Sequence, residues 1–294
     1  MASLKEIKGR VSSIRNIRKI TSAMRMVASA KLHRAQNAVD NMLPYEHRLR
    51  DMLSLLLYSE GDIVSPYTQP KGEIKRIAIV AFSSNSSLCG AFNVNILKKL
   101  NAKIREKYRK FDRHNILIFP VGRRIHDAVL REGYRPQGDF RTMAAKPNYT
   151  DAAALAQRLM ELYCTDQVDR IVLVYNHFKN IAIQTPTIEI YLPFSPQVSE
   201  LKKGAGKWNT PPDFILEPSR DELVASLFPK VLELKIFATL LDSAAAEHAA
   251  RTIAMQLATE NAEKLLDELT LLYNKSRQQA ITNELLDIIS GTAR

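Results

Sequence analysis

The stretch LKEIKGRVSSIRNIRKITSAMRMVASAKLHRAQNAVDN, residues 4–41, carries an apolar residue at almost every third or fourth position. The apolar positions are 4, 7, 11, 14, 17, 20, 24 and 27, then a shifted run at 28, 32, 35, 39 and 42. Steps of three and four are typical of a coiled-coil helix, and the shift predicts a change of register. The pattern predicts one amphipathic helix from about Leu4 to Tyr58, which we expect Pro44 to kink or break and Gly61 to end.

A second amphipathic stretch runs from about Pro229 to Ser290, behind a capping box at Ser219–Glu222. Pro229 is expected to kink this helix or to begin a new one. Its apolar positions are 234, 237, 241 and 244, then 258, 262, 265, 269 and 272. At ~1.5 Å per residue each helix would extend about 80–90 Å, too far to bury its apolar stripe locally. We therefore predict that the two helices pair antiparallel as one long coiled coil, with small residues such as Ala28 and Ala245 narrowing the seam.

The chain between these helices alternates apolar, β-branched runs with helical patterns. Strands are expected at 74–82, 115–121, 169–176 and 181–192, and helices at 93–110, 122–132 and 150–163. This order predicts a small Rossmann-like α/β domain with a mostly parallel sheet, in which 181–192 is an antiparallel partner. The predicted fold class is α/β, with an N-terminal shaft helix at 1–60, a globular domain at 74–216 and a C-terminal shaft helix at 219–294. Linkers are expected at 65–72 and 204–212.

The charge of the chain is uneven. Its formal net charge is +11, and residues 1–50 hold eleven Lys and Arg against three Asp and Glu. Residues 229–294 hold seven against nine. This asymmetry favours pairing of the two helices and leaves a basic face for an acidic partner, although a solvated basic face gives the same pattern.

Several functional classes find little support in the sequence. The two cysteines lie in different elements, so the sequence does not indicate a disulfide framework. A chain without such a framework is typical of a reducing compartment. The longest apolar runs are far below the ~18 residues of a membrane span. The basic start mimics a mitochondrial transit peptide, but its periodicity continues, so we interpret it as mature protein. The six histidines are dispersed without metal-ligand spacing, and Gly204–Lys207 lacks the pattern of a phosphate-binding loop.

Cys89 is the best catalytic candidate, because it follows a predicted strand and precedes a predicted helix, where a thiol pKa can be lowered. The sequence gives it no partnered histidine, so a structural thiol in a tight turn is the favoured interpretation. Cys164, at the end of a predicted helix, is expected in the core. The basic first helix also allows a nucleic-acid adaptor, although no aromatic residue precedes Tyr45.

The last turns of the second helix are densely apolar, from Ile281 to Ile289. A chain end normally frays and is polar. A static structural coiled coil would not need such an end, so we expect another molecule to enclose it.

Three stretches carry a resemblance to a known family. They are ITSAMRMVASAK at 20–31, SSNSSLCGAFN at 83–93 and YNKSRQQAITNELLDIISG at 273–291. The chain resembles the gamma subunit family of F-type ATP synthases along essentially its whole length. It departs from the family pattern at Asn85-Ser86-Ser87, where Asp-Arg-Gly is usual, at Asn283, where Gln is common, and at Thr292, where Ala is usual.

The resemblance implies a non-catalytic central rotor shaft that couples proton flow through a membrane ring to ATP synthesis and hydrolysis. The implied partners are the alpha and beta subunits, the epsilon subunit and the ring of c subunits, with no cofactor and no nucleic acid. The alternatives from the residues alone are the nucleic-acid adaptor and a thiol enzyme using Cys89. The implied partner-binding residues are Met24, Arg25, Lys31, Arg251, Met255, Asn283, Glu284, Leu285, Asp287 and Ile288. We expect a bacterial plasma-membrane enzyme, with this chain peripheral on the cytoplasmic side.

Overall fold

The computed structural model of the chain describes residues 4–58, 65–109, 111–195, 216–217 and 219–292. Its elements are α1 (Leu4–Tyr58), β1 (Ile77–Phe82), α2 (Phe92–Lys107), the 3-10 turn η1 (Arg113–Asn115), β2 (Ile116–Val121), α3 (Arg123–Arg131), α4 (Arg141–Ala145), α5 (Tyr149–Cys164), β3 (Arg170–Phe178), β4 (Gln184–Leu192) and α7 (Arg220–Thr292). Its contacts define two compact units: unit 1 joins the residues up to Ala30 with those from Arg251 onward, and unit 2 spans Lys31–Ala250. The predicted domain boundaries stay a prediction.

The two terminal helices form as predicted, but neither proline ends or starts one. α1 runs through Pro44 and α7 through Pro229, so the expected break and the expected new helix are wrong, while the alternative of a kink at each proline stays a prediction. Pro44 lies on the exposed side of α1, while Leu53 and Leu56 further along are buried in the core. Packing of the flanking turns compensates for the missing hydrogen bond at each proline. The expected stop at Gly61 and the linker at 204–212 lie outside the described residues.

The middle of the chain forms one four-stranded sheet in the order β2-β1-β3-β4. β1 is parallel to both β2 and β3, and β4 returns antiparallel to β3, as the sequence predicts. The short helix α4 and the turn η1 are the elements that the periodicity missed. The fold class is confirmed: two long helices with a mixed, mostly parallel α/β sheet.

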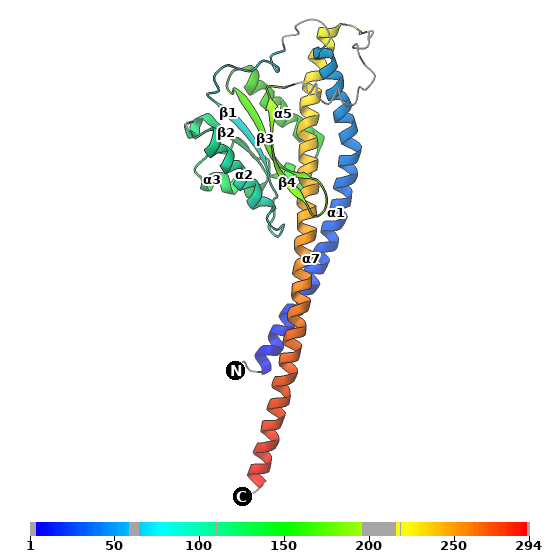
Figure 1. Ribbon diagram of the computed structural model, residues 1–294, viewed down its shortest axis with the longest axis vertical. Helices are drawn as coiled ribbons and strands as arrows, with labels where there is room; N and C mark the ends of the chain where they lie inside the picture. The colour runs from blue at the N-terminus through cyan, green and yellow to red at the C-terminus, as the bar shows by residue number, and fades with distance from the viewer. Residues whose placement is uncertain (1–3, 59–64, 110, 196–215, 218, 293–294) are drawn as a thin grey trace. The chain divides into compact units, whose positions relative to one another are not determined.

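Residues of β1 alternate between two hydrophobic clusters, because successive strand side chains point to opposite faces. Ala78, Val80 and Phe82 join a cluster that includes α5 and the unit 2 parts of α1 and α7. Ile77 and Ile79 join the cluster beneath α2 and α3. Figure 1 shows the result within unit 2: α2 and α3 cover one face of the sheet, and α5 covers the other.

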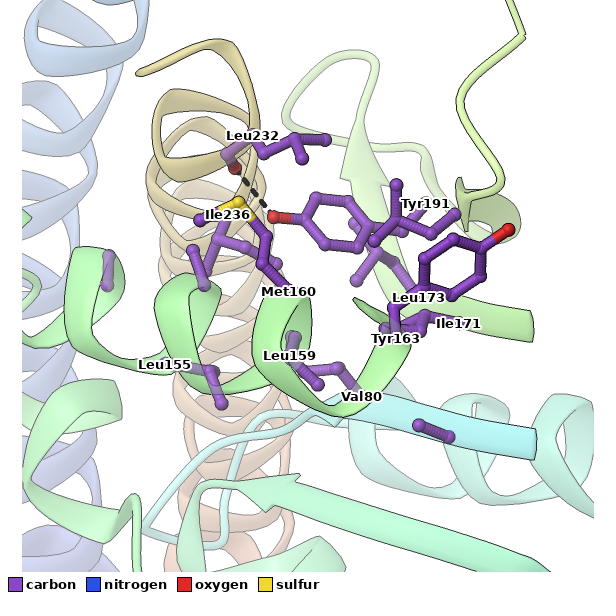
Figure 2. Packing of buried hydrophobic residues seen from close by; sticks show 14 of the residues in the cluster. Val80, Leu155, Leu159, Met160, Tyr163, Ile171, Leu173, Tyr191, Leu232 and Ile236 are labelled. Carbon is purple, nitrogen blue, oxygen red and sulfur yellow. Dashed lines mark hydrogen bonds between the residues drawn. The ribbon is translucent and has the colours of Figure 1, made fainter. Parts of the chain in front are cut away.

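The first of these clusters joins the sheet to α7. Figure 2 shows the side chains of α5, β3 and α7 interleaved, with the ring of Tyr191 between the sheet and α7. The Tyr191 hydroxyl donates a 2.9 Å hydrogen bond to the Leu232 carbonyl oxygen. Burial, with the nearby Glu233 adding to it, raises the pKa of Tyr191 well above its usual value. The hydroxyl therefore stays protonated at pH values at which a free tyrosine begins to ionise.

Replacement of Tyr191 by Phe tests this contact. At pH 8 the free energy of unfolding should fall by about 1 kcal/mol, because one buried hydrogen bond is lost. Above pH 10 the unfolded tyrosine ionises while the folded one does not, so its contribution to stability is lost as pH rises. The loss is about 1.4 kcal/mol per pH unit for each such tyrosine. Urea denaturation at pH 8 and pH 11 should therefore show a shallower alkaline loss for Tyr191→Phe than for the unchanged chain, and an equal loss would contradict the assignment.

Candidate partner-binding surface

Unit 1 is a pair of antiparallel helices formed by the start of α1 and the end of α7. The Thr259 hydroxyl donates to the Thr21 hydroxyl at 2.9 Å, and Arg18 lies 3.5 Å from Glu263. Residues that come later in α1 thus meet residues that come earlier in α7. Figure 1 shows that the C-terminal end of α7 continues past the N-terminal end of α1 within this unit.

The buried seam of α1 in this unit matches the predicted one only in part. The predicted positions Leu4, Ile7, Val11, Ile14 and Met24 are buried or half-buried. The covered stripe continues from Ile14 in steps of four and three, without the predicted register shift, through Arg18, Thr21, Arg25 and Ala28. The predicted seam residues Ile17, Ile20 and Val27 are instead 47%, 59% and 57% exposed. The sequence pattern followed the apolar residues, but the helices pack along a stripe that contains polar side chains.

On α7, too, some of the apolar residues that were predicted to lie in the seam are exposed. The expected seam residues Leu265 and Leu272 are exposed, while the neighbouring stripe is covered. The covered stripe includes Met255, Thr259, Ala262, Leu266, Leu269, Tyr273, Ser276 and Ala280. Tyr273 and Ser276 therefore extend the covered stripe beyond the last expected seam position, 272.

Unit 1 consequently exposes many large apolar side chains. The exposed ones are Ile17, Ile20, Met26, Val27, Leu257, Leu265, Leu271, Leu272, Ile281, Leu285, Leu286, Ile288 and Ile289. An exposed apolar surface of this extent is typical of a protein-interaction site. It favours an enclosing partner over a static coiled coil in water.

The predicted partner-binding residues fall into three groups. Asn283, Glu284, Leu285 and Ile288 are exposed on the last turns of α7; Asp287 lies in the same turns, but its side chain is not described. Met24, Arg25 and Arg251 are half-buried in unit 1, and Met255 is buried in its seam. Lys31 is exposed in unit 2. Met255 therefore belongs to the packing of the pair more than to its outer surface.

Cys89 lies in a closed polar turn after β1. Its thiol is buried, accepts a hydrogen bond from Asn93 Nδ2 at 3.1 Å and lies 3.7 Å from Ser84 Oγ. Its described hydrogen-bonding partners are Ser84, Ser86 and Asn93, none of which is a base. The arrangement supports a structural thiol. Cys164 is exposed, so the prediction that it lies in the core is wrong: the last turn of α5 directs it outward.

The crevice that α/β sheets use for ligands is occupied by the chain itself. Such crevices lie beyond the carboxyl ends of parallel strands, where the strand order reverses. Here Cys89 and Phe92 pack there against Ala246 of α7, and Asn176 of β3 donates to the Phe92 carbonyl oxygen at 3.2 Å. The α7 backbone approaches closely because residue 246 is an alanine. The α/β body therefore packs against α7 at the carboxyl ends of its parallel strands.

Two kinds of site are missing from the part of the chain that the structure describes. It contains no group of three His, Cys, Asp or Glu side chains placed to hold a metal ion. None of its helices combines the length and apolar character needed to cross a bilayer.

These features together define a class of protein. A helix pair with an exposed apolar end, attached to an α/β body whose ligand crevice is filled by its own helix, is a structural subunit of a larger assembly. Comparison with known proteins identifies the assembly. The family model described as ATP synthase matches residues 3–293.

Curated relatives give the same result. The ATP synthase gamma chain of Phocaeicola vulgatus is 53% identical over 292 residues, covering 99% of both chains. That of Bacteroides fragilis is 52% identical over the same length and coverage. The chain therefore belongs to the ATP synthase gamma chain family. It is a central-stalk subunit of the F-type ATP synthase and is not itself catalytic, as the main prediction stated and in contrast to the two alternatives.

Solved structures support the fold. A chain of the Euglena gracilis mitochondrial ATP synthase superposes with a TM-score of 0.65 at 19% identity, covering 99% of this chain and 93% of that one. A chain of the Tetrahymena thermophila central stalk and c-ring gives 0.56 at 21% identity, covering 81% and 99%.

Proposed function

We propose that unit 1 turns inside a ring of alpha and beta subunits and so couples proton flow through a membrane ring to ATP synthesis and hydrolysis. One observation carries this proposal: the last turns of α7 expose Ile281, Leu285 and Ile288. An apolar surface can turn within a collar because no directional hydrogen bond holds it at one angle. The Euglena relative comes from a structure described by its rotational state.

The coupling requires the helix pair to present a different face to each of three equivalent sites. Moving one site from 1:99 to 99:1 between two conformations takes about 5.5 kcal/mol of differential interaction. A paired-helix rod transmits such a difference better than a single helix, because each helix limits bending of the other. The pairing seen in unit 1, with Arg18 near Glu263 and Thr21 bonded to Thr259, supports this role.

The partner-binding residues divide by chemistry. Arg25, Lys31, Arg251 and Asn283 engage acidic loops of the beta subunits in this proposal, while Leu285 and Ile288 contact the apolar collar. Met24, Glu284 and Asp287 complete the contact surface, and Met255 supports it from the seam. The body of unit 2 contacts the epsilon subunit and the ring of c subunits.

The cellular setting follows from the family. The chain is part of a membrane-associated complex, and the relatives that are about half identical to it, from Phocaeicola vulgatus and Bacteroides fragilis, are bacterial. We place it at the bacterial plasma membrane, peripheral on the cytoplasmic side.

Reconstitution with alpha and beta subunits tests the proposal. The chain should assemble as one copy per ring and support ATPase activity, and Arg251→Glu should lower coupled ATPase by about tenfold, since it puts like charges together. Lys230→Glu is the matched control, because Lys230 is an exposed cation on α7 within unit 2. An unchanged coupled ATPase activity for Arg251→Glu would show that Arg251 is not part of the partner-binding surface. A chain that never enters the ring would overturn the whole proposal.

A further inference from the structure

The end of β3 is joined to α7 by one carboxylate. Asp242 accepts a 2.8 Å hydrogen bond from the Phe178 backbone N–H through Oδ1, and its Oδ2 lies 2.7 Å from His177 Nδ1. Asp242 is more than 60 positions from His177 and Phe178 in sequence, and all three residues belong to unit 2. We call this contact the Asp242 lock.

Burial distinguishes the Asp242 carboxylate from the other carboxylates that join the body and α7. Its side chain is 13% exposed, whereas the Glu189 partner of Lys235 is 30% exposed. Glu233 also accepts two bonds from α5, from Tyr149 and Gln157, but these contacts lie at the exposed surface. Water competes with exposed hydrogen bonds and much less with buried ones. The Asp242 carboxylate is thus better shielded from water than the Glu189 carboxylate, and its His177 partner lies at the surface with a side chain that is 52% exposed.

The Asp242 carboxylate is largely buried, so its charge is stabilised mainly by the hydrogen bonds from His177 and Phe178. Burial raises the pKa of Asp242, while the bonds from His177 and Phe178 and the charge of Lys235 lower it. Glu189 and the Tyr175 hydroxyl, 3.2 Å apart, face the same region from the sheet. Removal of either donor would leave a buried carboxylate poorly compensated.

Apolar contacts also lie at this end of the body. Cys89 and Phe92 pack against Ala246, one helical turn beyond Asp242. Apolar packing opposes separation of two surfaces but opposes sliding or rotation only weakly, because it is not directional. The alanine side chain is short, so it does not project far enough from the helix to block such movement.

We propose that the Asp242 lock transmits torque between the α/β body and α7, so that the body cannot turn on the helix when the rotor is loaded. This inference rests on the proposed rotor function. It assigns Asp242 and His177 as positioning residues for coupling, with no part in the chemistry of ATP.

The test uses the complete ATP synthase in inverted membrane vesicles. ATP-driven proton uptake, followed by quenching of a pH-sensitive dye, is divided by the rate of ATP hydrolysis. His177→Ala and Asp242→Ala should lower this ratio by about threefold or more, since two charge-assisted hydrogen bonds are weakened or lost. His177→Asn should retain it, because an Asn amide can donate from nearly the same position as Nδ1. Gln157→Ala, which removes an exposed bond from the body to Glu233, is the matched control and should leave the ratio unchanged.

A second measurement separates failure of the lock from failure of the rotor function. In the assembled complex, hydrogen exchange at the Phe178 amide should be about tenfold faster or more in Asp242→Ala, because its acceptor is gone. Faster exchange with an unchanged pumping ratio would overturn torque transmission while leaving the rotor function intact. A parallel fall of hydrolysis and pumping in His177→Ala, or an equal loss in Gln157→Ala, would also overturn it. Failure of the unchanged chain to assemble would instead overturn the proposed function.

Discussion

A chain that ends at Gln279 should fold normally and fail as a rotor. The deletion removes Ile281, Leu285, Leu286, Ile288 and Ile289, all of which are exposed in the folded chain. The free energy of unfolding should therefore change by no more than about 0.5 kcal/mol, as for other surface changes. Each of these side chains contributes about 1.5–3 kcal/mol when fully buried by a partner. Even partial burial predicts that assembly with alpha and beta subunits weakens by at least about a hundredfold.

The measurement is titration of alpha and beta subunits with the full and shortened chains, followed by ATPase and torque assays of the complexes. A chain that ends at Ser290 is the control, because it keeps all five apolar side chains. Equal assembly and torque for the chain ending at Gln279 would show that the apolar end is not the contact surface. A shortened chain that unfolds would show instead that these turns stabilise unit 1.

Replacement of Phe228 by Ala should cost the most stability of any single change considered. Phe228 is almost fully buried, with its ring centroid 5.2 Å from that of Tyr67 and 5.4 Å from that of Phe194. Removing a buried aromatic ring costs about 3–5 kcal/mol through lost transfer energy and the cavity left behind. The ring also joins α7 to the segment before β1, through Tyr67, and to the segment after β4, through Phe194, so its loss should loosen both contacts.

Chemical denaturation monitored by circular dichroism measures this loss. Ile190→Ala provides a matched control, because Ile190 is an exposed apolar residue of β4 and should change stability by less than about 0.5 kcal/mol. A cost below about 1 kcal/mol for Phe228→Ala would mean that the surrounding aromatic residues collapse into the space.

The long helices and the strand order were predictable because their patterns extend over many residues. Period-two and three–four spacing over such lengths leave few alternatives. The effect of single residues was less predictable. Pro44 and Pro229 were given too much weight, because neighbouring packing that no local pattern reveals holds the helix on both sides.

The seam was misplaced for a related reason. Apolar residues lie on two adjacent stripes of α1, and Ile17 and Ile20 were assigned to the inner one. Their exposure is the signal of a surface that faces a partner, which periodicity alone cannot distinguish from a seam. The meeting of Asp242 with His177 was also beyond sequence reasoning, because it depends on how the end of β3 lies against α7.

The polar residues in the seam of unit 1 help to set the alignment of the two helices along their length. Sliding one helix along the other by a heptad, about 10.5 Å, would keep the apolar spacing intact. It would also place Thr21 opposite Leu266 in place of Thr259, and Arg18 opposite Thr270 in place of Glu263. Both polar contacts would be lost in this direction. A slide of one heptad the other way would place Thr21 opposite Thr252, which can pair in the same manner, and Arg18 opposite Gln256 in place of Glu263. The Arg18–Glu263 ion pair therefore favours one alignment of the two helices, and with it one length of unpaired α7.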